Sequence, residues 1–177
     1  AAEGRDGFYK GEIAQRLVDG VRDAGGIWSM ADLEAYTVIE REPIRTQYDG
    51  YELITAPPPS SGGIAIAEIL NILEPYGVSK LDKAHATHLV VEAMRRAYRD
   101  RALYLGDPDF YAVPTAMLLD PNYAAGLRAS IMFDKATPSK MLPGRENLPD
   151  GTDTSHFSII DAEGNMVAAT LTVNTPF

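Results

Sequence analysis

Threonine is a weak nucleophile inside a polypeptide chain, because its hydroxyl does not attack an amide without a base. One remedy is to make threonine the first residue of a chain, so that its own α-amine acts as the base. An unperturbed α-amine titrates at about 7.7 to 8.0, which leaves a useful neutral fraction at physiological pH. Thr154 follows residues 136–153, a stretch rich in proline and glycine without hydrophobic periodicity. A cut between Asp153 and Thr154 would make Thr154 such a nucleophile.

The residues after this point predict a β-hairpin that would hold Thr154 in place. Two strand-like stretches, residues 154–161 and 165–174, flank Ala162-Glu163-Gly164, and a three-residue loop with a left-handed glycine commonly closes a hairpin. If the residues flanking this loop pair, Thr154 lies opposite Thr172 on the same face. Thr172 could then donate a hydrogen bond to the Thr154 oxygen. From the pattern alone, an ordinary structural pair of threonines is the commoner outcome.

Other side chains with possible chemistry have simpler interpretations. Ser60 and Ser61 have no histidine or acid placed to activate them, and a serine before Gly62-Gly63 is typical of a helix cap. His85 and His88 have a helical spacing that can hold a metal, but no third ligand is nearby in the sequence. These residues are therefore expected to be structural.

His156 is the histidine nearest to Thr154 in the sequence. We expect it to face away from Thr154 by strand alternation. On this basis it could help to frame the site, and we do not interpret it as a general base.

Hydrophobic spacing and turn residues predict the elements that must position these residues. Helices are predicted over residues 11–25, 29–35, 64–73, 85–105 and 121–131, and a first hairpin over residues 44–48 and 51–55. Asp49-Gly50 would close that hairpin, because this pair tolerates the positive φ angles of a tight turn. Pro57-Pro58-Pro59 excludes helix and central strand and begins a loop.

The helix predicted over residues 85–105 carries both apolar and charged side chains. Its spacing predicts a core-facing set of Leu89, Ala93, Ala97 and Leu103 and a mostly solvent-facing set of Arg95, Arg96, Arg99 and Asp100.

Composition limits the classes of function. The 177 residues are 45% hydrophobic, enough for a substantial core, and carry a formal net charge of -9, which disfavours binding to nucleic acid. No stretch is long and apolar enough to span a membrane, and residues 1–7 do not resemble a signal peptide. The absence of cysteine excludes disulfides and thiol nucleophiles.

Three motifs stand in order along the chain. The first is Pro57-Pro58-Pro59-Ser60-Ser61-Gly62-Gly63, and the second runs from Asp100-Arg101 through Tyr104-Leu105-Gly106-Asp107-Pro108-Asp109-Phe110. The third is Asp153-Thr154-Ser155-His156-Phe157-Ser158-Ile159-Ile160-Asp161, followed by Gly164-Asn165 and Thr170-Leu171-Thr172-Val173-Asn174. Together they resemble the γ-glutamyltranspeptidase family of N-terminal-nucleophile hydrolases: the first two are similar to large-subunit signatures and the third to the start of the small subunit. The resemblance implies an α+β fold, as part of an αββα sandwich. It also implies the C-terminal part of a large-subunit-like region (1–135), an irregular segment before the cleavage point (136–153) and the start of a small-subunit-like region with a central β-hairpin (154–177).

The resemblance further implies a mechanism. The precursor would cut itself between Asp153 and Thr154, and Thr154 would then transfer γ-glutamyl groups from substrates such as glutathione to water or an amine. Thr172 corresponds to the threonine that hydrogen-bonds the nucleophile, and Asn174 to the asparagine that contacts the substrate's α-amino group. The resemblance implies no metal or organic cofactor. It does imply a periplasmic or secreted location.

Several expected parts of such a site lie outside this sequence. The family binds the substrate carboxylate with an arginine from an upstream segment and serines from a downstream one, and it forms the oxyanion hole from downstream glycines. The chain would therefore need the remaining segments of its parent enzyme, and its uncovered apolar surface could favour self-association. Ser155 and Pro176 depart from the usual pattern, so a cephalosporin-acylase-like amidohydrolase and a catalytically silent fragment remain alternatives.

Overall fold

The computed structural model describes residues 3–142 and 154–172. The chain divides into two compact units, residues 1–42 and residues 43–177. The first unit is helical and contains α1 (Asp6–Tyr9), α2 (Gly11–Asp23) and α3 (Met30–Ala35). Ala14 and Val18 of α2 pack with Leu33 of α3 to form its core.

Local hydrogen bonds explain where α3 begins. The Ser29 hydroxyl accepts a hydrogen bond from the Asp32 N–H at 3.3 Å, and the Asp32 carboxylate accepts one from the Ser29 N–H at 2.7 Å. This reciprocal arrangement is a capping box, which satisfies backbone donors that the first helical turn leaves unpaired. This cap sets the start of α3 within the helix predicted over residues 29–35.

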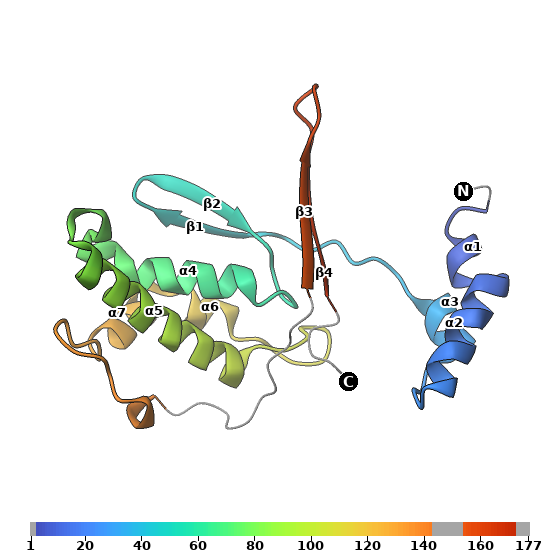
Figure 1. Ribbon diagram of the computed structural model, residues 1–177, viewed down its shortest axis with the longest axis horizontal. Helices are drawn as coiled ribbons and strands as arrows, with labels where there is room; N and C mark the ends of the chain where they lie inside the picture. The colour runs from blue at the N-terminus through green and yellow to red at the C-terminus, as the bar shows by residue number, and fades with distance from the viewer. Residues whose placement is uncertain (1–2, 143–153, 173–177) are drawn as a thin grey trace. The chain divides into compact units, whose positions relative to one another are not determined.

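The second unit contains two hairpins, four α-helices and three short 3-10 helices among its described residues (Figure 1). Its elements are β1 (Ile44–Tyr48), β2 (Tyr51–Thr55), α4 (Gly62–Leu73), η1 (Glu74–Tyr76), η2 (Val78–Lys80), α5 (Lys83–Tyr104), α6 (Thr115–Leu118), α7 (Pro121–Arg128), η3 (Ser139–Met141), β3 (Thr154–Ile160) and β4 (Met166–Thr172). The predicted helices and both predicted hairpins are present, with ends that shift by a few residues.

The β1–β2 hairpin forms over the predicted residues, with the predicted two-residue turn. Tyr48 pairs with Tyr51 across the turn. Asp49 and Gly50 adopt φ angles of 49° and 81°, as a two-residue turn that matches strand twist requires.

Helix α4 begins after the loop of residues 56–61 that follows β2, and Gly63 permits the helix to approach this loop closely. A Cβ atom at Gly63 would lie 2.0 Å from the Ala56 carbonyl oxygen, a distance that side chains do not tolerate. Ser61 precedes the helix, but its side chain makes no capping hydrogen bond. Its hydroxyl instead accepts a hydrogen bond from Arg101 Nε of α5 at 2.9 Å. Ser61 therefore occupies the expected N-cap position, although its hydroxyl binds Arg101 instead of the first turn of α4.

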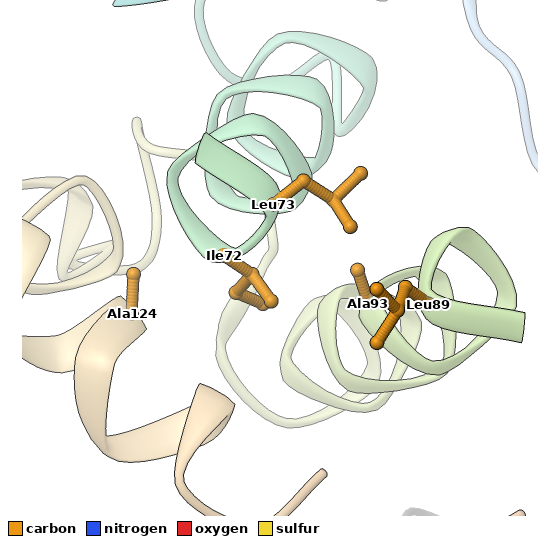
Figure 2. Close-up of a cluster of buried hydrophobic side chains, with 5 residues drawn as sticks. All are labelled: Ile72, Leu73, Leu89, Ala93 and Ala124. Atoms are coloured by element: carbon orange, nitrogen blue, oxygen red, sulfur yellow. The ribbon is translucent and has the colours of Figure 1, made fainter. Parts of the chain in front are cut away.

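The core of the second unit forms where α4, α5 and α7 meet. Ile72 and Leu73 of α4, Leu89 and Ala93 of α5, and Ala124 of α7 form one buried cluster (Figure 2). Burial of apolar side chains of this size contributes roughly 1.5–3 kcal/mol for each large residue. This cluster holds the three helices together.

Helix α5 also buries charged groups, which corrects the predicted division of its faces. Arg96 and Asp100 are both 0% exposed, although we expected them on the solvent face. Leu103, expected in the core, is 38% exposed. Arg96 and Asp100 continue the helical face of Leu89 and Ala93, so position along the helix outweighs residue type here.

Asp100 belongs to a buried polar cluster that joins three helices. Its carboxylate accepts hydrogen bonds from Tyr123 Oη of α7 at 2.6 Å and from Arg99 Nη1 at 3.0 Å. Glu68 of α4, which is 1% exposed, lies beside Asp100. Burial, the charge of Asp100 and a hydrogen bond to Asp100 raise the pKa of Glu68 to about 9. Glu68 is therefore protonated at neutral pH and donates to Asp100.

The structure is α+β, as predicted, with helices packed in each unit and antiparallel hairpins in the second. Within residues 3–142 and 154–172, no helix has the length and apolar content needed to cross a membrane.

The Glu68 carboxyl predicts a specific pH dependence of stability. Its folded pKa of about 9 lies above its ordinary value of 4.5, so its stabilising contribution is complete below about pH 4.5 and is lost as the pH rises toward 9. Glu68→Gln keeps a donor to Asp100 and cannot ionise. We expect its free energy of unfolding to exceed that of the wild type by an amount that grows by up to about 1.4 kcal/mol per pH unit.

Urea denaturation followed by circular dichroism between pH 5 and 9 measures this difference. Glu74→Gln, which removes an exposed carboxylate just beyond α4, is the matched control and should track the wild type. A constant offset between Glu68→Gln and wild type across this range would contradict the prediction.

Candidate functional site

Strands β3 and β4 form an antiparallel hairpin, shown in Figure 1 toward the C-terminal end of the chain. Thr154 pairs directly with Thr172, as the loop length predicted. Directly opposed residues in an antiparallel pair point to the same face of the sheet. The register is confirmed, whereas the chemical roles assigned to the two threonines stay predictions. Asp153 and Asn174 lie outside the described residues.

The turn between these strands fixes the register through Asp161. Its carboxylate accepts hydrogen bonds from the Asn165 N–H at 2.8 Å, from Asn165 Nδ2 at 2.8 Å and from the Glu163 N–H at 3.1 Å. The hydrogen bonds from Asn165 lower the pKa of Asp161, because they stabilise its charged form. Gly164 has a φ of 84°, the left-handed conformation expected for the loop. A slip by one residue would turn Thr172 to the opposite face.

His156 lies on the same face as Thr154, and our expectation that it faces away was wrong. Side chains alternate along a strand with a period of two, so residues two apart share a face. His156 Nδ1 lies 2.8 Å from Thr170 Oγ1, and Nε2 lies 3.1 Å from Ser158 Oγ. A neutral imidazole has one donor and one acceptor nitrogen, so it can serve both hydroxyls at once. The alternation of side chains along β3 and the hairpin register, both available from the sequence, place His156, Ser158 and Thr170 on one face.

The other face of the hairpin is apolar and exposed in this chain. Its larger members are 45–59% exposed: Phe157, Ile159, Val167 and Leu171. Burial of side chains of this kind normally stabilises a sheet, and a two-stranded hairpin alone is only marginally stable. This face therefore has the composition of a surface that packs against further structure.

The remaining candidate side chains have structural partners. His85 Nδ1 lies 2.5 Å from Asp82 Oδ2 at the start of α5, and its ring stacks on Phe133. His88 Nε2 lies 2.8 Å from the Met132 carbonyl oxygen. No group of three or more potential ligands that could hold a metal ion occurs among the described histidine, aspartate and glutamate side chains.

The fold and this hairpin define an α+β protein with a threonine at the start of a strand, opposite a second threonine. The family model for gamma-glutamyltranspeptidase matches residues 1–177. The chain belongs to the γ-glutamyltranspeptidase family.

One curated relative and two solved structures illustrate the match. A glutathione hydrolase proenzyme from Pseudomonas sp. strain A14 is 48% identical over 100% of this chain and 31% of its own length. The γ-glutamyltranspeptidase of Helicobacter pylori superposes with a TM-score of 0.74 at 35% identity, over 86% of this chain and 44% of that chain. The cephalosporin acylase of Bacillus halodurans superposes with a TM-score of 0.75 at 30% identity, over 92% of this chain and 28% of that chain.

These lengths also show how much of a relative the chain represents. It spans about a third of the curated relatives that it matches, 31% in the case of the Pseudomonas proenzyme. The exposed apolar face of the β3–β4 hairpin is consistent with this partial coverage.

The turn geometry predicts the effect of Asp161→Ala. Loss of the carboxylate removes the acceptor for three hydrogen bonds that define the turn. We expect several-fold faster amide hydrogen exchange in β3 and β4, because the hairpin opens more often. Hydrogen-exchange mass spectrometry on the 177-residue chain measures this, with the exposed Glu163→Ala as control. Equal exchange in both variants and wild type would mean that Asp161 does not hold the register.

Proposed function

We propose that the parent of this chain is an enzyme that transfers or hydrolyses γ-glutamyl groups of glutathione and related amides, with Thr154 as its nucleophile. The observation that carries this proposal is the Thr154–Thr172 pairing at the open end of the β3–β4 hairpin. Family membership supports the same reaction.

Maturation would begin with attack of the Thr154 hydroxyl oxygen on the Asp153 carbonyl carbon. The peptide C–N bond breaks, an ester forms to the threonine oxygen, and the hydroxyl proton ends on the freed nitrogen. Water then hydrolyses the ester, which restores the hydroxyl and leaves a carboxyl group at Asp153. Thr154 thereby gains the free α-amine that can serve as its base.

The mature reaction would repeat the same chemistry on a substrate. The Thr154 oxygen attacks the γ-glutamyl amide carbon, the leaving amine takes the proton, and an acyl ester remains on the enzyme. Water or an acceptor amine then releases the acyl group. Thr172 would hold the nucleophile by a hydrogen bond, and Asn174 would bind the α-amino group of the substrate.

A complete site needs parts that other segments of the parent would supply. The upstream arginine, the downstream serines and the oxyanion-hole glycines expected from the family are absent from this sequence, and such oxyanion donors contribute about 3 kcal/mol or more each. In this proposal residues 1–135 form the C-terminal part of the large-subunit-like region. Residues 136–153 precede the cleavage point, and residues 154–177 form the start of the small-subunit-like region. The isolated chain would therefore be catalytically silent.

A second candidate function is that of a cephalosporin-acylase-like amidohydrolase. Similarity to the Bacillus halodurans acylase supports it, as do the departures at Ser155 and Pro176 from the usual family pattern. Both functions use the same nucleophile and differ in the acyl group that they accept. Turnover of a γ-glutamyl anilide but not of an acylated cephalosporin favours the first candidate, and the reverse favours the second.

We also propose a cellular location for the parent and an association of the isolated chain. The family resemblance alone supports a periplasmic or secreted parent. The exposed apolar face of the β3–β4 hairpin supports self-association of the isolated chain, since large uncovered apolar patches promote it.

The first functional prediction concerns cleavage. We expect the full-length parent to separate into two polypeptides, the second beginning at Thr154, and Thr154→Ala to stay whole because it lacks the attacking oxygen. Intact-mass measurement after incubation identifies the products. Cleavage of the Thr154→Ala parent at the same bond would show that a foreign protease makes the cut.

The second functional prediction concerns turnover. Release of chromophore from a γ-glutamyl anilide should occur with the cleaved parent, and Thr172→Val should lower kcat by about tenfold to a hundredfold, because it removes the hydrogen bond that positions the nucleophile. Thr46→Val, the same change on strand β1 of the other hairpin, is the matched control. Undiminished turnover by Thr172→Val would remove Thr172 from the mechanism.

A further inference from the structure

The open end of the β3–β4 hairpin has a hydrogen bond between side chains that the proposed reaction does not use. His156 of β3 pairs directly with Thr170 of β4, and His156 Nδ1 lies 2.8 Å from Thr170 Oγ1. A single paired position separates this pair from the Thr154–Thr172 pair, and positions two apart on a strand share a face. The hydrogen bond therefore joins the two strands beside the candidate nucleophile.

The ring of His156 has a partner at each of its nitrogens. Its Nε2 lies 3.1 Å from the hydroxyl oxygen of Ser158, on the same strand and the same face. A neutral imidazole donates from one nitrogen and accepts at the other, and a hydroxyl can do either. Ser158 thus orients the ring along β3 and leaves Nδ1 directed across the hairpin at Thr170.

The two ends of the hairpin differ in what holds them closed. At the turn, the Asp161 carboxylate accepts three hydrogen bonds, two of them from backbone N–H groups. At the other end, Thr154 and Thr172 form the last pair of the ladder. The ends of strands open easily, with a free energy near zero. A side-chain hydrogen bond between His156 and Thr170 therefore has its largest effect at this end.

Cleavage between Asp153 and Thr154 would weaken this end further. Before the cut, Thr154 is an interior residue of the chain, with a peptide bond on each side. After the cut it is a chain end, and chain ends are ordered only where other groups hold them. The same cut frees the α-amine that the proposed reaction uses as its base. The nucleophile therefore becomes reactive and loses a restraint in one step.

We infer that the hydrogen bond between His156 and Thr170 keeps the mature Thr154 in register opposite Thr172. The inference rests on the proposed function, since it assumes that Thr154 becomes the first residue of its polypeptide. His156 and Thr170 act through the two strands that carry these threonines. They are positioning residues for turnover, and neither is the base that activates the Thr154 hydroxyl.

The size of the effect follows from the opening of a strand end. A side-chain hydrogen bond shifts such an opening equilibrium by about fivefold. At a free energy near zero the end is open about half of the time with the bond, and about five-sixths of the time without it. The paired fraction, and with it the rate of attack by Thr154, then falls about threefold.

Two substitutions remove the hydrogen bond and one retains it. His156→Leu keeps an apolar side chain of moderate size and removes both ring nitrogens, and Thr170→Val replaces the hydroxyl by a methyl group. His156→Asn keeps a polar atom near the position of Nδ1, so it can still reach Thr170. Gln47→Ala removes an exposed polar side chain from β1 of the other hairpin and is the matched control.

The experiment uses the full-length parent and measures two rates. Intact mass followed over time gives the rate of cleavage before Thr154, and the first turnover of a γ-glutamyl anilide gives the rate of acylation of the cleaved enzyme. We expect His156→Leu and Thr170→Val each to acylate about threefold more slowly than wild type and to cleave at the wild-type rate. His156→Asn should acylate faster than His156→Leu, and Gln47→Ala should match wild type in both rates.

The double variant tests whether the two residues act through one bond. Once either partner is replaced the bond is absent, so His156→Leu/Thr170→Val should acylate no more slowly than the slower single variant. Effects that multiply, to about ninefold, would show that the two residues act separately and would overturn the inference.

The remaining outcomes distinguish this inference from the proposed function. A wild-type parent that stays whole, or that is cleaved before Thr154 and never acylates, overturns the proposed function. If wild type performs both steps and His156→Leu acylates at the same rate, the inference alone fails. It also fails if His156→Leu slows cleavage as much as acylation, because a general disturbance of the hairpin affects both, or if His156→Asn acylates no faster than His156→Leu.

Discussion

Helix α5 buries three ionisable side chains on the face that also carries its core residues, and the second unit is organised around their partners. Glu92, Arg96 and Asp100 are each no more than 1% exposed. A buried charge without a partner costs several kcal/mol, so each of these side chains needs hydrogen bonds from other parts of the chain. Asp100 accepts a hydrogen bond from Tyr123 of α7. Arg96 donates to Ser130, at the end of α7, and to Thr137, and Glu92 accepts from the Thr137 N–H.

This requirement connects the apolar core to the segment that leads to the candidate nucleophile. The cluster of Ile72, Leu89 and Ala124 holds α4, α5 and α7 together without specifying how later residues return to them. Apolar contacts are not directional, whereas hydrogen bonds to a buried ion pair fix both position and orientation. The polar groups of α5 thus determine where residues 137 and 139 lie, upstream of the bond at Thr154.

The β3–β4 hairpin is determined by a different and more local constraint. Asp161 and Gly164 set the turn, and the turn sets the pairing of Thr154 with Thr172. One face of the hairpin then carries His156 with its hydroxyl partners, and the other carries apolar side chains that this chain leaves exposed. A hairpin with this division needs a layer on its apolar face, in agreement with a chain that spans a third of its relatives.

Local interactions could be predicted well because the residues that make them are neighbours in the sequence. The capping box of Ser29, the Asp49-Gly50 turn and the Thr154–Thr172 register all depend on residues within one turn or one hairpin. Three motifs in order were likewise enough to indicate the γ-glutamyltranspeptidase family, which the family match confirms.

The predicted exposure of Arg96 and Asp100 was wrong because it used residue type in place of helical position, and the predicted orientation of His156 was wrong because residues two apart on a strand share a face. Arg96 and Asp100 share the buried face of α5 by spacing, yet their charge suggested solvent. The sequence alone indicated five of the helices, both hairpins, the register of the second hairpin and the family. Only the tertiary structure decided which charges are buried, that Ser61 binds Arg101, and that α5 holds Thr137, because those partners are distant in the chain and meet only when the helices pack.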